Sequence, residues 1–190
     1  MSKAEADPAF SAIESSGQRL FFALWPSPEL RSRIFRCGQL AAAETPAGLQ
    51  PVENLHLTLL FLGQVSSEIQ RCLEQTASVL TLTSFNLEFD RLVHRRKSRM
   101  LWLQPDIVPP PLQSLVVALR QVAVSCGLNV EYRPFCAHIT LQRKVVRATV
   151  TLPQPDFVWP VREFVLVASK RLSTGAQYRI VKKWPLYDGG

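Results

Sequence analysis

Two of the three histidines in this 190-residue chain lie in matching surroundings. His56 and Thr58 are two residues apart in an apolar run that ends at Gly63. His138 and Thr140 repeat this spacing, and a leucine follows each threonine. An imidazole can take or give a proton near neutral pH, and a hydroxyl can hydrogen-bond an oxyanion. The repeated pattern therefore predicts acid–base chemistry.

Each copy taken alone also fits a structural role. A single histidine on a half-buried strand is more often hydrogen-bonded to a neighbour than chemically active, since short motifs match by chance. Two copies favour a chemical site, because polar side chains in apolar strands cost free energy unless they are paired. If both strands line one cavity, two imidazoles and two hydroxyls converge there.

The apolar residues around the first motif indicate a β-strand. Side chains alternate between the two faces of a strand, so His56 and Thr58 share one face. Leu55, Leu57 and Leu59 share the other face and are expected to enter a core.

Helices and further strands must position these segments. The pattern predicts helices over residues 27–43, 66–80 and 112–126, the last ended by Gly127. It predicts strands over residues 19–25, 54–63, 85–93, 100–103, 137–141, 162–169 and 177–184. The proline-rich residues 106–111 and 148–160 are predicted to be irregular. Helices and strands do not alternate one for one, so antiparallel or mixed sheets are favoured over a doubly wound fold.

The composition narrows the class of protein. A hydrophobic content of 47% supports a packed core, and no apolar run reaches the roughly 20 residues of a membrane helix. The net charge of +7 favours a polyanionic partner such as nucleic acid, although it also fits a surface that is merely solubilised. Residues 1–18 lack the features of a signal peptide, so a disordered extension and a cytoplasmic protein are expected.

The four cysteines form no Cys-x-x-Cys pair and have no histidine at metal-ligand spacing, so no metal site is predicted. They are expected to be reduced, partly buried thiols. They are Cys37, Cys72, Cys126 and Cys136. Cys136 lies near His138, but no activating partner for a nucleophile is close in the sequence.

The segment Arg91–Arg99 is the most basic part of the chain. It fits either a solvated hairpin loop or an arm that contacts a phosphate backbone, and both interpretations stay open. His94 lies in this segment outside any motif and is expected at the surface.

Three segments together resemble a known family, the two-histidine (2H) phosphoesterases. They are Leu55–Gly63, Arg133–Arg143 and Tyr178–Leu186. Within that superfamily the likeness is greatest to the bacterial RNA 2′,3′-cyclic phosphodiesterases, also called 2′-5′ RNA ligase-like proteins. It implies a bilobal α+β fold in which two antiparallel sheets face a central cleft, with helices outside. Residues 19–186 would form this single domain, and residues 187–190 a C-terminal tail.

The resemblance also implies a reaction. A 2′,3′-cyclic phosphate at an RNA end, or on a nucleotide, would be hydrolysed to a 2′-phosphate by a monomer without metal or cofactor. Some members also join RNA ends through a 2′-5′ linkage. By motif position, His56 would donate a proton to the departing 3′ oxygen, and His138 would accept one from water. Thr58 and Thr140 would bind the phosphate.

Three nearby positions bear on the pocket. Arg143 could bind the phosphate, but strict alternation puts it on the opposite face from His138 unless the strand twists or bulges. Ala137 stands where the family commonly has proline. Gln142 stands where a small residue is frequent, and alternation predicts that it shares a face with Thr140 and narrows the pocket.

Two other functions fit the same residues. One is a non-catalytic RNA-binding module whose histidines stack on RNA or hydrogen-bond to it. The other is a sister 2H activity, such as opening the cyclic phosphate of a small nucleotide or trimming RNA 3′ ends.

Overall fold

The computed structural model describes residues 17–41, 48–130, 134–146, 157–173 and 175–189, and it confirms the α+β class. Three α-helices, a short 3-10 helix and nine strands are found in these ranges. They are β1 (Gln18–Leu24), α2 (Pro28–Ala41), η1 (Val52–Asn54), β2 (Leu57–Val65), α3 (Ser67–Ala77), β3 (Phe85–Phe89), β4 (Arg91–Arg95), β5 (Met100–Gln104), α4 (Pro110–Ser125), β6 (Ile139–Arg143), β7 (Phe157–Val161), β8 (Glu163–Leu172) and β9 (Gly175–Pro185).

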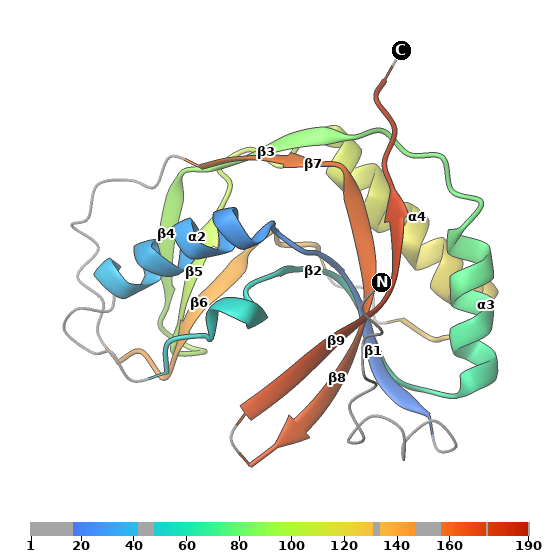
Figure 1. Ribbon diagram of the computed structural model, residues 1–190, viewed down its shortest axis with the longest axis horizontal. Coiled ribbons are helices and arrows are strands. Elements are labelled where there is room, and N and C mark those ends of the chain that lie inside the picture. Colours follow the sequence, from blue (N-terminus) through green and yellow to red (C-terminus); the bar gives the residue numbers. More distant parts are fainter. Residues whose placement is uncertain (1–16, 42–47, 131–133, 147–156, 174, 190) are drawn as a thin grey trace, which may run out of the picture.

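An antiparallel sheet in the order β4-β5-β6-β2-β1-β8-β9 forms the centre of the molecule. In Figure 1, α3 and α4 lie together on one side of the molecule, and the β8–β9 hairpin projects from its lower edge. The main core lies between the sheet and the helices, and it buries the predicted Leu55, Leu57 and Leu59. A smaller cluster around Phe21 and Val167 lies apart from this main core.

The two halves of this sheet meet at a narrow junction. Within the described residues, β2 and β6 are paired only at Leu57 and Ile139. One wall of the site is therefore β4-β5-β6, and the other is β2-β1-β8-β9. The expected two sheets are thus joined edge to edge, and both histidine motifs begin beside the junction.

Two β-bulges occupy equivalent places in the two halves. In the β1–β2 ladder, Phe22 pairs with Leu60 and Ala23 with Thr58, so Leu59 is the extra residue. In the β5–β6 ladder the partners of adjacent residues are Gln142 and Thr140, so Leu141 is the extra residue. A bulge re-aims the side chains that follow it.

Some predicted boundaries were wrong. Residues 157–160, expected to be irregular, belong to β7, which pairs with β3 in a separate two-stranded sheet. The single strand predicted over 85–93 is two strands in two sheets, because the chain turns at Asp90. Helix α4 begins at Pro110, two residues earlier than predicted, since proline suits the first turn of a helix. Gly127 ends it with a φ of 81°, as predicted.

The prediction of four reduced cysteines was wrong for one pair. Cys72 and Cys126 form a disulfide that links α3 to the end of α4. They are 54 residues apart in the sequence, so only the packing of the two helices brings them together. Cys37 and Cys136 are free thiols.

The ends of the chain differ from each other. The extension predicted over residues 1–18 lies outside the described residues up to residue 16. At the other end, Tyr187 is hydrogen-bonded through its backbone to Leu82 and Ser84, and Asp188 accepts a hydrogen bond from the Ser84 hydroxyl. No helix among the described residues is long and apolar enough to cross a membrane.

Candidate active site

The five residues predicted to act together line one cavity of about 730 Å³. They are His56, Thr58, His138, Thr140 and Arg143. We call this space the histidine cavity. Residues from β1, β5 and the β8–β9 hairpin also line it, so the cavity spans both walls of the sheet. The two copies of the motif therefore converge on one space.

The two imidazoles are held in the same way. The Nδ1 atom of His56 lies 2.6 Å from the carbonyl oxygen of Asn54, and that of His138 lies 2.8 Å from the carbonyl oxygen of Cys136. A carbonyl only accepts, so Nδ1 carries the proton and donates in both rings. The Nε2 atom of each neutral ring is then an acceptor. The Thr58 hydroxyl lies 3.2 Å from Nε2 of His56 and can donate to it.

Aromatic side chains surround His56. Trp25 is stacked on the imidazole, with ring centres 5.1 Å apart and planes within 6° of parallel. Phe21 and Tyr178 contact the same ring, at centroid distances of 5.0 and 5.1 Å. These contacts fix the plane of the imidazole and remove most of it from water.

This environment disfavours the charged form of His56. Burial lowers the pKa of His56 from 6.5 to about 4. The hydrogen bond to the Asn54 carbonyl opposes this effect, while the charges of His138 and Arg143 add to it. The imidazole of His56 is therefore neutral at pH 7.

Trp102 is stacked on the His138 imidazole, as Trp25 is stacked on that of His56. Its ring is stacked on the imidazole at 3.8 Å, with an angle of 19° between the planes, and the Arg95 guanidinium lies 4.9 Å from the indole centre. Burial lowers the pKa of His138 as well. The Cys136 carbonyl opposes the shift, and Arg95 and Arg143 contribute to it.

The bulge at Leu141 decides which side chain reaches the cavity. Gln142 pairs with Leu101, is 1% exposed and is not among the residues that line the histidine cavity. The prediction that Gln142 narrows the pocket was therefore wrong. Arg143 pairs with Met100 and lines the cavity, because the extra residue returns it to the face of Thr140.

The charges around the cavity are of one sign. Arg19, Arg143 and Arg171 line it together with the two histidines, and none of the described residues that line it is acidic. Among the described residues, no group of three or more histidine, cysteine or acidic side chains could hold a metal ion. The cavity offers imidazoles, hydroxyls and guanidinium groups, a set suited to an anion and to proton transfer.

Several residues in or beside the histidine cavity were not predicted from the sequence. Trp25, Trp102 and Tyr178 hold the imidazoles, and Phe61 lies in the cavity with 48% of its surface exposed. Arg19 lies over the Phe61 ring at 4.6 Å. The only local signal for Phe61 is its place three residues after Thr58. Trp102 comes from a different strand, which no spacing within one segment could reveal.

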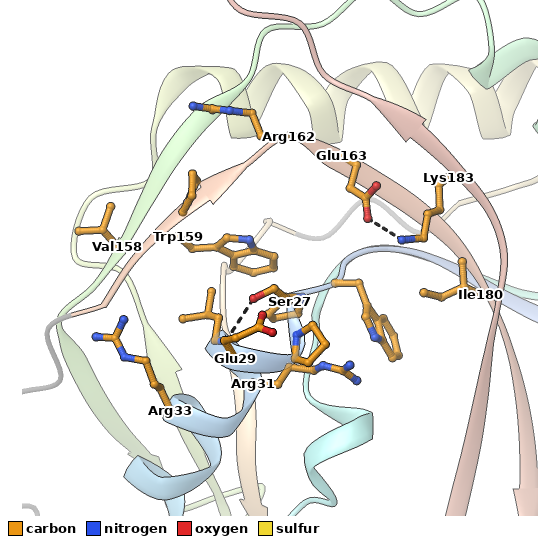
Figure 2. A pocket seen from close by; sticks show the side chains of 15 residues that line it. Ser27, Glu29, Arg31, Arg33, Val158, Trp159, Arg162, Glu163, Ile180 and Lys183 are labelled. Atoms are coloured by element: carbon orange, nitrogen blue, oxygen red, sulfur yellow. Dashed lines mark hydrogen bonds and ion pairs between the residues drawn. The ribbon is translucent and has the colours of Figure 1, made fainter.

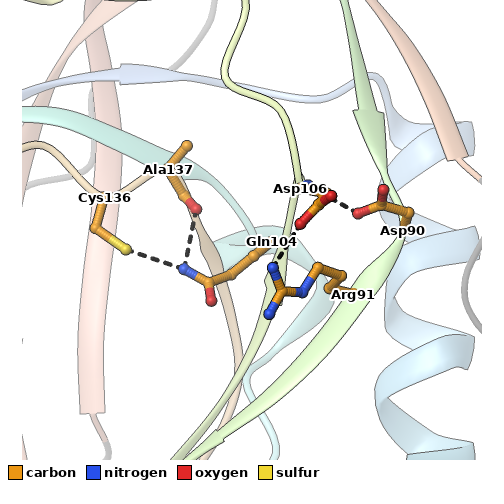
Figure 3. Close-up of polar contacts among 6 residues, drawn as sticks. All are labelled: Asp90, Arg91, Gln104, Asp106, Cys136 and Ala137. Atoms are coloured by element: carbon orange, nitrogen blue, oxygen red, sulfur yellow. Dashed lines mark hydrogen bonds and ion pairs between the residues drawn. The ribbon is translucent and has the colours of Figure 1, made fainter.

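The third histidine has a structural role. His94 is half-buried rather than at the surface, and its Nε2 atom lies 3.3 Å from the carbonyl oxygen of Val145, to which it can donate. On the neighbouring strand, the Gln104 amide donates to Cys136 Sγ and to the Ala137 carbonyl (Figure 3). This contact fixes the segment that leads into His138.

A second hollow, of about 660 Å³, lies behind Trp25 at the start of α2 (Figure 2). Trp159 also lines it, and we call it the tryptophan pocket. Its cations are partly balanced, since Lys183 pairs with Glu163 at 2.8 Å and Arg162 lies 3.8 Å from Asp188. The tryptophan pocket therefore lacks the uniform charge of the histidine cavity.

Known proteins share this sequence and this geometry. Residues 26–171 match the model of the 2′-5′ RNA ligase superfamily. The chain is 38% identical to the RNA 2′,3′-cyclic phosphodiesterase of Escherichia coli, over 90% of this chain and 98% of that protein. It is 32% identical to the Bacillus subtilis protein of the same name, over 48% of this chain and 52% of the relative.

A solved structure extends the similarity to three dimensions. The crystal structure of E. coli LigT complexed with 3′-AMP superimposes with a TM-score of 0.79 and 36% identity, covering 90% of this chain and 98% of that one. The family model spans most of the chain, and the E. coli relative is matched over nearly its whole length. This protein therefore belongs to the 2′-5′ RNA ligase superfamily.

Proposed function

We propose that this protein hydrolyses the 2′,3′-cyclic phosphodiester at the end of an RNA chain, leaving a 2′-phosphomonoester. The observation that carries the proposal is the pair of imidazoles, held alike through Nδ1, that line one cavity together with Arg143. The relatives named RNA 2′,3′-cyclic phosphodiesterase support this choice of substrate. The proposed steps use these side chains and a water molecule.

Two proton transfers account for the reaction. Nε2 of His138 takes a proton from water while the water oxygen attacks phosphorus, opposite the bond to O3′. Nε2 of His56 gives a proton to O3′ as that bond breaks, and the phosphate stays on O2′. Each transfer typically contributes ~10²–10⁴-fold to the rate. The pair ends with its protons exchanged, and solvent restores the starting form.

The phosphate of the bound substrate changes the protonation of the two imidazoles. The pKa values of both histidines are lowered, so a proton on His56 is disfavoured. An anion between the rings favours the protonated form of its neighbours. Substrate binding therefore helps to load the proton that His56 donates. Thr58, Thr140 and Arg143 are proposed to bind the phosphate oxygens, where fixed donors stabilise the developing charge.

One residue of the cavity, Phe61, is suited to contact the base of the terminal nucleotide. Phe61 is the exposed aromatic ring of the cavity, and base stacking on such a ring is worth about 1–3 kcal/mol. We propose that the terminal base lies on Phe61. The same cations and histidines could act on a 5′-hydroxyl in place of water, and this would join two RNA ends.

We further propose that residues 19–186 act as one catalytic domain and as a monomer, because His56, His138 and Arg143 meet in one cavity within a single chain and the proposed steps use no residue of a second copy. RNA as the substrate favours a cytoplasmic location. Sedimentation velocity of the active protein measures its mass, and fractionation of cells with an antibody measures its location.

The experiment that tests the function measures turnover of adenosine 2′,3′-cyclic phosphate and of an RNA with the same end, by His56→Ala and His138→Ala. We expect kcat to fall by about 10²–10⁴-fold in each variant, because each removes one proton transfer. Chromatography of the product distinguishes a 2′-phosphate from a 3′-phosphate. Wild-type rates in either variant would refute the mechanism.

His94→Gln is the matched control, since it removes a histidine outside the cavity and keeps a hydrogen-bond donor toward Val145. Its rate is expected to equal that of the wild type. RNA that binds to the wild-type protein without turnover would favour the RNA-binding module. Turnover of the mononucleotide but not of the RNA would favour the small-nucleotide activity.

A further inference from the structure

We propose that the β4–β5 hairpin, residues 91–104, binds the RNA backbone on the 5′ side of the cyclic phosphate. We call this segment the basic hairpin. The inference rests on the proposed function, because it concerns where the rest of the strand lies when its end is in the histidine cavity. It resolves the two interpretations that the sequence left open for Arg91–Arg99.

The charge of the basic hairpin is concentrated away from its base. Arg95, Arg96, Lys97 and Arg99 follow one another closely, and residues 91–104 contain no acidic residue. Among the described residues, no carboxylate is ion-paired with any of these four cations, whereas at the base of the hairpin Arg91 pairs with Asp106 at 2.6 Å (Figure 3). The cations near the turn are therefore available to a polyanion.

The basic hairpin is held firmly beside His138. Its two strands pair at five positions, and β5 also pairs with β6. At the turn, the backbone of Val145 donates to the Arg99 carbonyl at 2.9 Å and accepts from the His94 ring. Cations on a fixed framework lose less entropy on binding than cations on a flexible loop.

A continuous line of contacts leads from the basic hairpin to the site of reaction. The Arg95 guanidinium lies over Trp102, and Trp102 is stacked on His138. Trp102 lines the histidine cavity, while Arg96 and Lys97 are exposed just beyond Arg95. A strand that leaves the cavity along this wall meets Arg95 first and the turn next.

The chemistry of the substrate requires such a path. A 2′,3′-cyclic phosphate uses both hydroxyls of the last ribose, so the strand continues only through the 5′ oxygen of that nucleotide. Every further nucleotide adds a phosphate that has to be placed outside the cavity. The wall with the densest run of cations free of acidic partners is the basic hairpin, so single-stranded RNA is the occupant that fits.

The test compares two substrates with the same reactive end, adenosine 2′,3′-cyclic phosphate and a single-stranded RNA of ten nucleotides with that terminus. The variant is the double substitution Arg96→Gln and Lys97→Gln. Arg95 is kept because it contacts Trp102, and Arg99 is kept because its φ of 52° makes a substitution there a separate backbone change. The control is Arg36→Gln with Arg71→Gln, which removes two exposed cations from α2 and α3.

We expect kcat/KM on the RNA to fall about tenfold in the hairpin variant at 50 mM salt, while turnover of the mononucleotide stays within about twofold. The dependence of log(kcat/KM) on log salt should weaken by about 1.4 for the RNA, which is two phosphate contacts at about 0.7 each. The control variant should match the wild type on both substrates. Equal losses on both substrates, an unchanged RNA rate, or the same loss in the control would overturn the proposal.

A binding measurement separates this inference from the proposed function. Fluorescence anisotropy of the labelled RNA is measured with the His138→Ala background, with and without the hairpin substitutions. Weaker binding in the hairpin variant supports the RNA path even if the wild-type protein hydrolyses neither substrate. Equal binding in the two proteins overturns it even if hydrolysis is observed.

Discussion

At the scale of single residues, the two imidazoles are alike in their hydrogen bonds and different in their surroundings. Each donates from Nδ1 to a carbonyl two residues earlier in the chain. His56 is enclosed by three aromatic rings, and the pKa of His56 is lowered to about 4. His138 is also buried, but its pKa is affected by Arg95 as well as by Arg143. The proposed mechanism therefore needs the bound phosphate to favour a proton on His56, the ring whose pKa is lowered to about 4.

The lowered pKa values predict the pH dependence of the reaction. In the proposed mechanism the active form carries one proton on the pair, and in the free protein the pKa values of both rings are lowered from 6.5. The population of that form rises as the pH falls from 7 toward the higher pKa of the pair, and it falls again below the lower one. A plot of kcat/KM for the mononucleotide against pH should therefore be bell-shaped, with its centre below pH 6.5.

Steady-state kinetics in buffers of constant ionic strength measure this curve. Trp25→Leu leaves His56 more open to water, so the acid side of its curve should move to higher pH. A wild-type curve centred above pH 7.5 would contradict the proposed pair.

At the scale of elements, the bulges after Thr58 and Thr140 build the site. Each inserts a leucine, so that the residue three positions after the threonine, rather than two, reaches the cavity. In β2 that residue is Phe61, and in β6 it is Arg143. One wall thus places an aromatic ring in the cavity, and the other places a cation there.

The bulge in β6 predicts different effects for two adjacent substitutions. Arg143→Gln should lower kcat/KM about 10–100-fold and leave the melting temperature unchanged, because it removes a charged contact in the cavity. Gln142→Ala should cost about 1–3 kcal/mol of stability with little change in KM, because Gln142 is buried on the other face. Kinetics and thermal unfolding of both variants measure these effects.

Arg36→Gln is the matched control for the loss of charge, since Arg36 is exposed on α2 and does not line the histidine cavity. A regular strand without the bulge would reverse the result, with Gln142→Ala changing KM and Arg143→Gln silent.

Strand alternation in the sequence predicted correctly which residues share a face, and it failed where a bulge adds one residue. His56 and Thr58 were correctly assigned to one face because alternation holds over two residues. Alternation failed at Gln142, since neither Leu141 nor its neighbours carry a local signal for a bulge. The stacking of Trp102 on His138 depends on the register of two separate strands, which a single sequence does not encode locally.

At the scale of the whole molecule, a single β-pairing among the described residues joins the two walls of the cavity, and a different helix packs against each wall. Helix α2 packs against β6, and α4 packs against β2. The disulfide between Cys72 and Cys126 joins α3 to α4, behind the wall that carries His56. Stability of that half therefore depends on a covalent link as well as on the core.

The disulfide predicts a loss of stability on reduction. Closing a loop of 54 residues stabilises a fold by up to about 4 kcal/mol in the chain-entropy description. Urea unfolding of the wild type should shift to lower urea with dithiothreitol, and Cys72→Ala with Cys126→Ala should match the reduced protein with or without the reagent. Rates at 25 °C should be unaffected, because neither cysteine lines the histidine cavity. An unfolding midpoint that does not respond to dithiothreitol would argue against the bond.

Because an indole is stacked on each of the two imidazoles, tryptophan fluorescence should respond to the protonation of His56 and His138. Of the four tryptophans, Trp25 lies on His56 and Trp102 on His138, while Trp159 and Trp184 are buried elsewhere. A protonated imidazole quenches the fluorescence of an adjoining indole more strongly than a neutral one does. The emission intensity of the unlabelled protein therefore reports when either ring gains its proton, and stopped-flow mixing can follow that event as a ligand arrives.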